Sequence, residues 1–178
     1  MKKSVTIISL AYCFLSSASA QGYWTQKASF SGTARGDAFS FSIGDKGYVG
    51  GGEDISGNYA NDFWQYDATT NTWEQKSSFI DASRWQAASF NIGTKGYVCT
   101  GGGASNTALW EYDSPTDSWT QKANFINARN TAVGFSIGNK GYIGTGASQG
   151  PICEKDFWEY NPSSNIWMQK ADIPIGRS

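Results

Sequence analysis

One phrase occurs four times in this sequence: Trp24-Thr25-Gln26-Lys27, Trp73-Glu74-Gln75-Lys76, Trp119-Thr120-Gln121-Lys122 and Trp167-Met168-Gln169-Lys170. Successive tryptophans are 49, 46 and 48 residues apart. A period in this range is typical of repeat proteins in which each repeat is one supersecondary unit. The phrase therefore indicates the fold class more firmly than any other stretch of the chain.

The second repeat shows the internal pattern most clearly. Gln86–Ile92 has the alternation and bulk of a buried strand, and the turn Gly93-Thr94-Lys95-Gly96 leads to a second strand at Tyr97-Val98. A third strand follows at Leu109–Tyr112, and turn residues then precede the strand that carries the Trp119 phrase. Each repeat is therefore predicted to be four short strands in one antiparallel sheet.

The repeats divide the chain into three units at about residues 28–76, 77–122 and 123–170, and residues 171–178 begin another. The Trp24 phrase is a fourth strand with no first three strands before it. Four phrases thus mark three complete sheets.

These repeats resemble those of the kelch family of β-propellers, whose mark is a glycine doublet followed by a tyrosine and a tryptophan separated by six residues. The matching residues are Gly51, Gly52, Tyr66 and Trp73, then Gly102, Gly103, Tyr112 and Trp119, then Tyr160 and Trp167 after a doublet that Thr145 interrupts. The resemblance implies an all-β propeller with three four-stranded blades of an incomplete ring and an orphan N-terminal closing strand. Because closed rings usually have 4–8 blades, we expect an N-terminal fragment of a longer propeller or, alternatively, an oligomer that completes the ring.

Residues 1–20 have the pattern of a secretory signal peptide. Lys2 and Lys3 precede an apolar run, and Ala18-Ser19-Ala20 resembles a cleavage site. A lipoprotein anchor on Cys13 is the alternative, which the bulky Tyr12 disfavours. The run is shorter than the ~20 residues that span a bilayer. We therefore expect a secreted, cell-surface or periplasmic protein with no membrane insertion after signal cleavage.

The composition disfavours several functional classes. After residue 20 there are 12 basic and 15 acidic side chains, which gives no reason to expect a nucleic acid partner. The sequence has no histidine, which excludes Ser-His-Asp and Cys-His catalysis, His-ligated metals and the copper site of kelch-type oxidases. We expect no metal, no cofactor and no catalytic residue, although Glu53 and Asp54 form a carboxylate pair on a variable loop.

Two cysteines, Cys99 and Cys153, remain after the signal segment. An exported protein permits a disulfide, but connectivity does not follow from sequence. Both a disulfide and two unpaired thiols stay open.

Most of the recurring aromatic residues are expected to pack between blades, with a sugar-stacking surface as the alternative. Trp85 breaks the pattern, because the other repeats have Gly36 and Asn130 at its position. It is therefore the candidate binding aromatic.

Arginines also recur, just before the first strand of each repeat: Arg35, Arg84, Arg129 and, at the start of the next repeat, Arg177. In several kelch propellers such arginines lie near one end of the central channel and contact acidic ligands. The resemblance makes these four the ligand-binding candidates. The alternative is that each arginine binds blade carbonyls or a neighbouring carboxylate.

Two functions of different class follow. The first is an exported kelch-repeat binding module, whose protein or carbohydrate ligand contacts the arginines and the loops at 53–62, 104–108 and 147–156. The second, implied by the resemblance, is a sugar-acting propeller enzyme such as a sialic acid mutarotase. The lack of histidine does not exclude the enzyme, but no residue pattern supports it, so we favour the binding module and keep the enzyme as the alternative.

Overall fold

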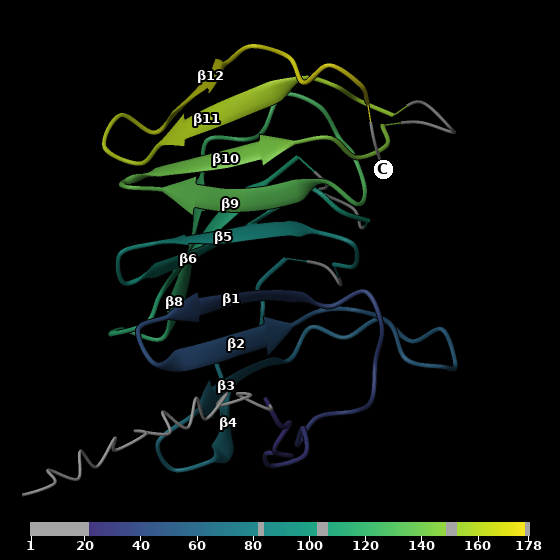
Figure 1. Cartoon of the computed structure of the whole chain (residues 1–178), viewed down its shortest axis with the longest axis vertical. Helices are drawn as coiled ribbons and strands as arrows, with labels where there is room; N and C mark the ends of the chain where they lie inside the picture. Colours follow the sequence, from purple (N-terminus) through teal and green to yellow (C-terminus); the bar gives the residue numbers. More distant parts are fainter. Residues whose placement is uncertain (1–21, 82–83, 103–106, 149–152, 177–178) are drawn as a thin grey trace, which may run out of the picture.

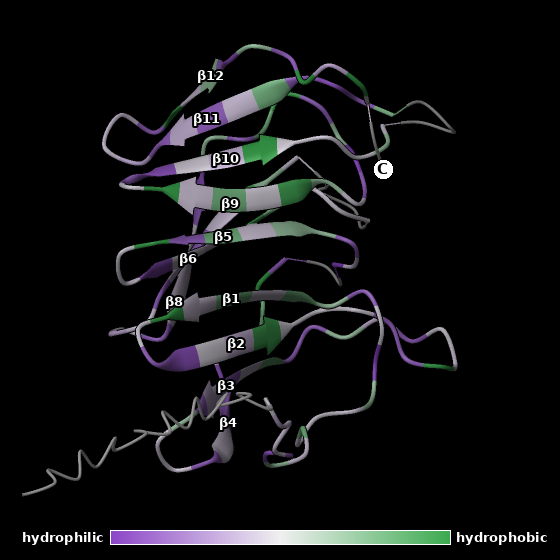
Figure 2. Cartoon of the chain, in the orientation of Figure 1, coloured by the Kyte–Doolittle hydropathy of each residue, from purple (hydrophilic) through white to green (hydrophobic). Residues whose placement is uncertain are grey.

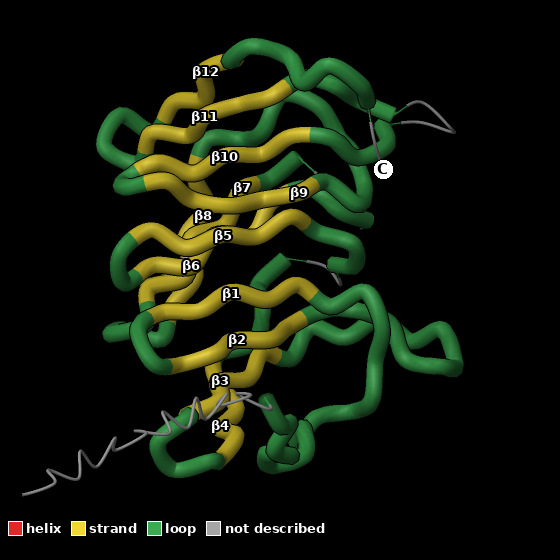
Figure 3. Tube along the Cα trace, in the orientation of Figure 1, coloured by secondary structure: helices red, strands yellow, loops and turns green. Residues whose placement is uncertain are grey.

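The computed structural model describes residues 22–81, 84–102, 107–148 and 153–176, in which there are strands, turns and loops but no helix (Figure 3). The described strands form three four-stranded antiparallel sheets that stand next to one another without closing into a ring (Figure 1). The signal segment, Gly103 and Arg177 lie outside the described residues. The all-β architecture with three blades is confirmed.

Each blade has its strands in sequence order. Blade 1 comprises β1 (Phe39–Ile43), β2 (Lys46–Gly50), β3 (Phe63–Asp67) and β4 (Thr72–Lys76); blade 2 comprises β5 (Ala88–Ile92), β6 (Lys95–Cys99), β7 (Leu109–Asp113) and β8 (Ser118–Lys122); blade 3 comprises β9 (Val133–Ile137), β10 (Lys140–Gly144), β11 (Phe157–Asn161) and β12 (Ile166–Gln169). The first strands of neighbouring blades are adjacent, with β5 between β1 and β9.

The described part of the chain has two hydrophobic core clusters, one at each junction between blades. In β1, Phe39, Phe41 and Ile43 are buried while the alternate residues are exposed, as the period of a strand requires. Hydrophobic segments lie along β1, β2, β9 and β10 in Figure 2, whereas the turns are mostly hydrophilic.

Glycines on the second strands let neighbouring blades approach closely. A Cβ placed on Gly96 of β6 would lie 2.1 Å from the ring of Phe41, and a Cβ on Gly141 of β10 would lie 2.1 Å from the ring of Phe90. No real side chain tolerates such a contact. At both junctions, then, a phenylalanine ring of one blade occupies the space above a glycine of the next.

The N-terminal segment differs from the expected closing strand. Residues 22–30 form no strand, and Tyr23 and Trp24 are 88% and 103% exposed. A strand needs backbone groups of a neighbour with which to pair, and the third strands β3, β7 and β11 already pair with β4, β8 and β12. The segment has the sequence of a fourth strand, but the described residues provide no third strand for it.

The tyrosine and tryptophan that mark each repeat do more than fill space, because they hold the linker that leads into their own blade. In blade 1, Asn71 Oδ1 accepts hydrogen bonds from Tyr66 Oη and from the Ala28 N–H, both at 2.8 Å, and Trp73 Nε1 donates to the Ala28 carbonyl at 3.1 Å. We call this arrangement the linker clasp. It recurs with Tyr112, Asp117, Trp119 and Ser77 in blade 2, and with Tyr160, Asn165, Trp167 and Ala123 in blade 3.

Cys99 is buried in the core, Cys153 is exposed, and no disulfide joins them. Burial is the main reason that the pKa of Cys99 rises to about 12. Cys99 therefore behaves as a small core residue. Separately, no helix among the described residues has the length and apolarity needed to cross a membrane.

Candidate functional site

The three described candidate arginines are held by the blades themselves. The side chains of Arg35, Arg84 and Arg129 are 4%, 0% and 0% exposed. Each Nη1 donates to a backbone carbonyl that follows a second strand: Gly51 at 3.1 Å, Thr100 at 2.7 Å and Thr145 at 3.1 Å. Each guanidinium also lies over a phenylalanine ring, of Phe30, Phe79 and Phe125 respectively. These contacts agree with the alternative that each arginine binds carbonyls of its own blade. A contact between these arginines and a ligand stays a prediction.

Each arginine also forms an ion pair with an aspartate, and the same aspartate accepts a tryptophan indole N–H. In blade 1, Asp62 binds Arg35 and accepts from Trp64 Nε1 at 2.7 Å. The hydrogen bond from Arg35 is the main cause of the lowered pKa of Asp62. Blade 3 repeats the arrangement with Arg129, Asp156 and Trp158.

Blade 2 builds the same pair from a different place in the chain. Asp62 and Asp156 directly precede the third strand of their blades, but Ala108 stands at that position in blade 2. The carboxylate is supplied instead by Asp81 in the linker, which binds Arg84 and accepts from Trp110 Nε1 at 3.0 Å. The ion pair is thus maintained although its sequence position changes.

Two adjoining hollows open next to Arg35, at the end of the blade where the loop 53–62 lies. They have volumes of about 240 and 400 Å³, and Arg35 and Asp54 line both. The first hollow is also lined by Thr33, Asn58, Tyr59, Ala60, Asn61 and Asp62. The second is also lined by Ala34, Gly36, Asp37, Glu53 and Ile55. We call the two together the Arg35 hollow.

The loop that forms one wall of the hollow is ordered by Asp54. Its Oδ1 accepts the N–H groups of Ser56 and Asn58 at 2.8 and 2.9 Å, and its Oδ2 accepts Asn58 Nδ2 at 3.0 Å. The side-chain hydrogen bond from Asn58 is the main cause of the lowered pKa of Asp54. Glu53 forms isolated bridges to Gly36 on one side and to Tyr59 on the other, which ties the loop to the segment around Arg35.

Trp85 lies behind this wall rather than fully in solvent. Its ring stacks on Tyr59 with centroids 4.3 Å apart and an angle of 16° between the planes. On the other side it lies so close to Gly102 that a Cβ there would be 2.1 Å from the indole. Trp85 therefore supports Tyr59, which is 46% exposed and presents the accessible aromatic surface.

The repeat pattern predicted Trp85 and the arginines but missed Tyr59. Tyr59 belongs to the loop 53–62, whose counterparts at 104–108 and 147–156 differ from it in length and sequence, so periodicity carries no information about Tyr59. Its aromatic character in an otherwise polar loop was the available signal.

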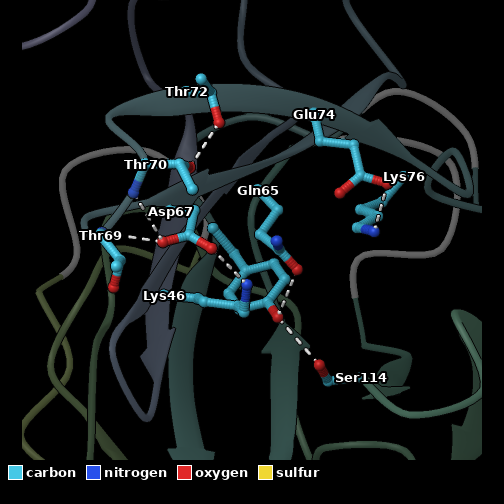
Figure 4. A network of polar contacts seen from close by, with 10 residues as sticks. Lys46, Gln65, Asp67, Thr69, Thr70, Thr72, Glu74, Lys76 and Ser114 are labelled. Carbon is cyan, nitrogen blue, oxygen red and sulfur yellow. Dashed lines mark hydrogen bonds and ion pairs between the residues drawn. The ribbon is translucent and has the colours of Figure 1, made fainter.

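A polar network lies at the opposite end of blade 1, near the hairpin turns (Figure 4). Lys46 Nζ donates to Asp67 at 2.8 Å, and this hydrogen bond is the main reason that the pKa of Asp67 falls to about 2. Tyr48 Oη donates to Gln65 at 3.0 Å and lies 2.9 Å from Ser114 Oγ of blade 2. The network therefore connects the first two blades.

The equivalent position between blades 2 and 3 has no such hydrogen bond between the blades among the described residues and forms a hollow instead. Pro162 replaces Ser114 there, and a hollow of about 470 Å³ contains Lys95, Tyr97, Glu111 and Lys122. Burial alone would raise the pKa of Glu111, but hydrogen bonds from Tyr97 and Lys95 lower it overall. Lys95 and Lys122 lie 3.2 and 3.3 Å from Glu111 Oε1, so the charges of this hollow are largely matched internally.

Within the described ranges no group of three or more His, Cys, Asp or Glu side chains could hold a metal ion. Two carboxylates at the Arg35 hollow are already engaged, because Asp62 binds Arg35 and Asp54 accepts backbone N–H groups.

Comparison with known proteins supports the fold. No protein-family model and no curated protein sequence matches this chain. The solved structure of YjhT is similar, with a TM-score of 0.72 and 21% sequence identity. The similarity covers 85% of this chain and 56% of YjhT, so the chain spans little more than half the length of that protein.

Proposed function

We propose that this chain is a carbohydrate-binding part of an exported kelch-type propeller, with the sugar bound in the Arg35 hollow. The observation that carries the proposal is the position of Tyr59, whose partly exposed ring borders a hollow that also contains Asn58 and Asn61. An aromatic face next to groups that both donate and accept hydrogen bonds suits a sugar ring. The stacking partner Trp85 holds the aromatic face in place.

The charges around the hollow favour a neutral sugar over an acidic one. Arg35 is the cationic residue that lines the hollow, and Asp62 already forms a bidentate ion pair with it. Three further carboxylates, those of Asp37, Glu53 and Asp54, line the hollow. A sugar carboxylate would meet this excess of negative charge.

Isothermal titration and ligand-observed NMR with glucose, galactose and N-acetylglucosamine test the proposal. We expect at least one of these sugars to bind, and Tyr59→Ala to weaken its binding about tenfold through the lost ring contact. Tyr23→Ala, at an exposed aromatic far along the chain from the hollow, is the matched control. Binding of none of the three sugars, or equal binding by the Tyr59→Ala protein, would contradict the proposal.

A sugar-acting enzyme is the second candidate. The fold shared with YjhT fits it, since the kelch resemblance includes sialic acid mutarotases, and the hollow brings Asp54 and Asp62 near one cation. Exchange NMR of N-acetylneuraminic acid anomers distinguishes the two candidates. Accelerated exchange that Asp54→Asn abolishes would support the enzyme, and an unchanged exchange rate would count against it.

A further inference from the structure

Blade 3 has an apolar face that no described residue covers. Val133, Phe135, Ile137, Ile166 and Met168 are between 41% and 63% exposed. Cross-strand pairing places Phe135, Tyr142, Glu159 and Met168 in one row across the four strands, which puts these side chains on the same face. Glu159 interrupts this row, but the side chains on either side of it form an exposed apolar surface, and such a surface marks an interaction site.

The junctions inside the chain show what covers such a face. Phe135 has the same position in β9 as Phe41 in β1 and Phe90 in β5. Those two rings lie over Gly96 and Gly141 on the second strand of the following blade. The surface that fits Phe135 is therefore another blade with a glycine at this position of its second strand.

Blade 1 presents such a glycine on its own uncovered side. Gly47 is at that position of β2, and a Cβ built on it would meet only Tyr66 Cβ, at 4.0 Å. The space that phenylalanine rings occupy above Gly96 and Gly141 is thus open above Gly47.

Backbone hydrogen bonds point to the same arrangement. The Gln86 N–H donates to the Asp37 carbonyl at 2.9 Å, and the Thr131 N–H donates to the Gln86 carbonyl at 3.0 Å. These three residues have equivalent positions and nearly equal positive φ angles of 55°, 53° and 56°. Among the described residues the series ends with the Asp37 N–H at one side and the Thr131 carbonyl at the other, which are a complementary donor and acceptor.

We propose that a second copy of this chain covers the apolar face of blade 3 with its blade 1. The contact is head-to-tail, and two copies repeat it twice to close a ring of six blades, within the usual range of propellers. Phe135 of each copy then lies over Gly47 of the other, and the Asp37 N–H reaches the Thr131 carbonyl.

One segment must move for this contact to form. The Ile173 N–H donates to the Lys155 carbonyl at 2.8 Å, as the Phe79 N–H does to Asn61 at the first junction. Residues 171–176 therefore occupy the place to which the second copy brings its residues 28–34. Because the linker clasp holds Ala28 and the rings of Trp64 and Trp73 hold Phe30 against their own blade, we expect residues 171–176 to be the segment displaced.

Light scattering after gel filtration of the purified chain tests the proposal. We expect twice the monomer mass, and a monomer for both Gly47→Leu and Phe135→Asp, with dissociation constants raised on the order of thirtyfold or more. Ile80→Asp, which adds the same charge at another exposed apolar residue, is the control and should leave the dimer intact. Retained near-ultraviolet circular dichroism establishes that each variant is folded.

Mixing the two variants gives the sharpest result. Each keeps one intact face, so an equimolar mixture of Gly47→Leu and Phe135→Asp should form a heterodimer through a single junction. A monomeric parent chain would mean that something other than a second copy covers the face, and would overturn the proposal. Assemblies of the parent chain larger than two copies, or a dimer that neither substitution affects, would also overturn it.

Discussion

Replacing Asp81 with alanine removes the carboxylate from the buried ion pair of blade 2. The Arg84 side chain is fully buried and that of Asp81 is 10% exposed, so the guanidinium loses a partner that water cannot replace. Breaking a buried pair by removing one partner costs about 3–5 kcal/mol, and the lost acceptor of the Trp110 indole adds about 1 kcal/mol. We expect the free energy of unfolding to fall by about 4–6 kcal/mol.

A second substitution should restore this stability. Ala108 has the position that Asp62 and Asp156 have in the other blades, and its carbonyl lies 3.5 Å from Arg84 Nη1. Ala108→Asp in the Asp81→Ala background therefore rebuilds the arrangement of blades 1 and 3. Ala108→Asp alone should destabilise the protein, because it places two carboxylates beside one buried cation.

Urea unfolding followed by tryptophan fluorescence measures these effects. With a slope of about 2 kcal/mol per molar urea, the midpoint of the single variant should fall by about 2–3 M, and that of the double variant should largely recover. Asp172→Ala, which removes an exposed ion pair with Lys155, is the control and should change little. If Asp81→Ala stays within about 1 kcal/mol of the parent, or if the double variant is no more stable than the single one, the Arg84–Asp81 ion pair does not stabilise blade 2.

Two further predictions concern stability. The pKa values of Asp62 and Asp156 are lowered from the usual 3.8, so both residues stabilise the protein above that pH and lose this contribution as the pH falls through the lower folded-state values. The melting temperature should therefore decline between pH 6 and pH 2, and it should decline less steeply in an Asp62→Asn/Asp156→Asn protein. Equal dependence of the two melting temperatures on pH would contradict this. Gly96→Ala should destabilise the protein by about 1–3 kcal/mol in urea unfolding, because the added methyl overlaps the ring of Phe41. Gly36→Ala, where an added Cβ has no atom within 4 Å, is the control and should cost little. Similar losses for both would show that the glycine contact does not matter.

The strands could be predicted because hydrophobic alternation, turn residues and the repeat period all agree. The start of the first strands could not. Gln86 continues the predicted strand of blade 2, but its positive φ of 53° ends the extended conformation, and β5 begins at Ala88. Asp37 and Thr131 adopt the same conformation at the equivalent positions. Because these three side chains differ in length, branching and charge, residue type gives no sign of the shared backbone geometry.

The arginines of the candidate site could be predicted from the sequence, but their aspartate partners could not. Repetition reveals residues that share an environment, and it identified Arg35 and its equivalents without showing that aspartates neutralise them. The pairing of Arg84 with Asp81 depends on a linker residue outside the repeat register. The missing aspartate at Ala108 was visible in the sequence, but only the three-dimensional arrangement shows which carboxylate replaces it.

The linker clasp restricts which amino acids can end the outer turn of a blade. Asn71, Asp117 and Asn165 have positive φ angles of 56°, 48° and 54°, and each side-chain oxygen accepts both a tyrosine hydroxyl and a linker N–H. Glycine allows the backbone angle but has no acceptor, whereas asparagine and aspartate adopt this angle more readily than other residues with a side chain and carry the acceptor oxygen. Asparagine and aspartate satisfy both demands, so drift at these three positions is confined to exchange between two amino acids while the surrounding turn residues vary.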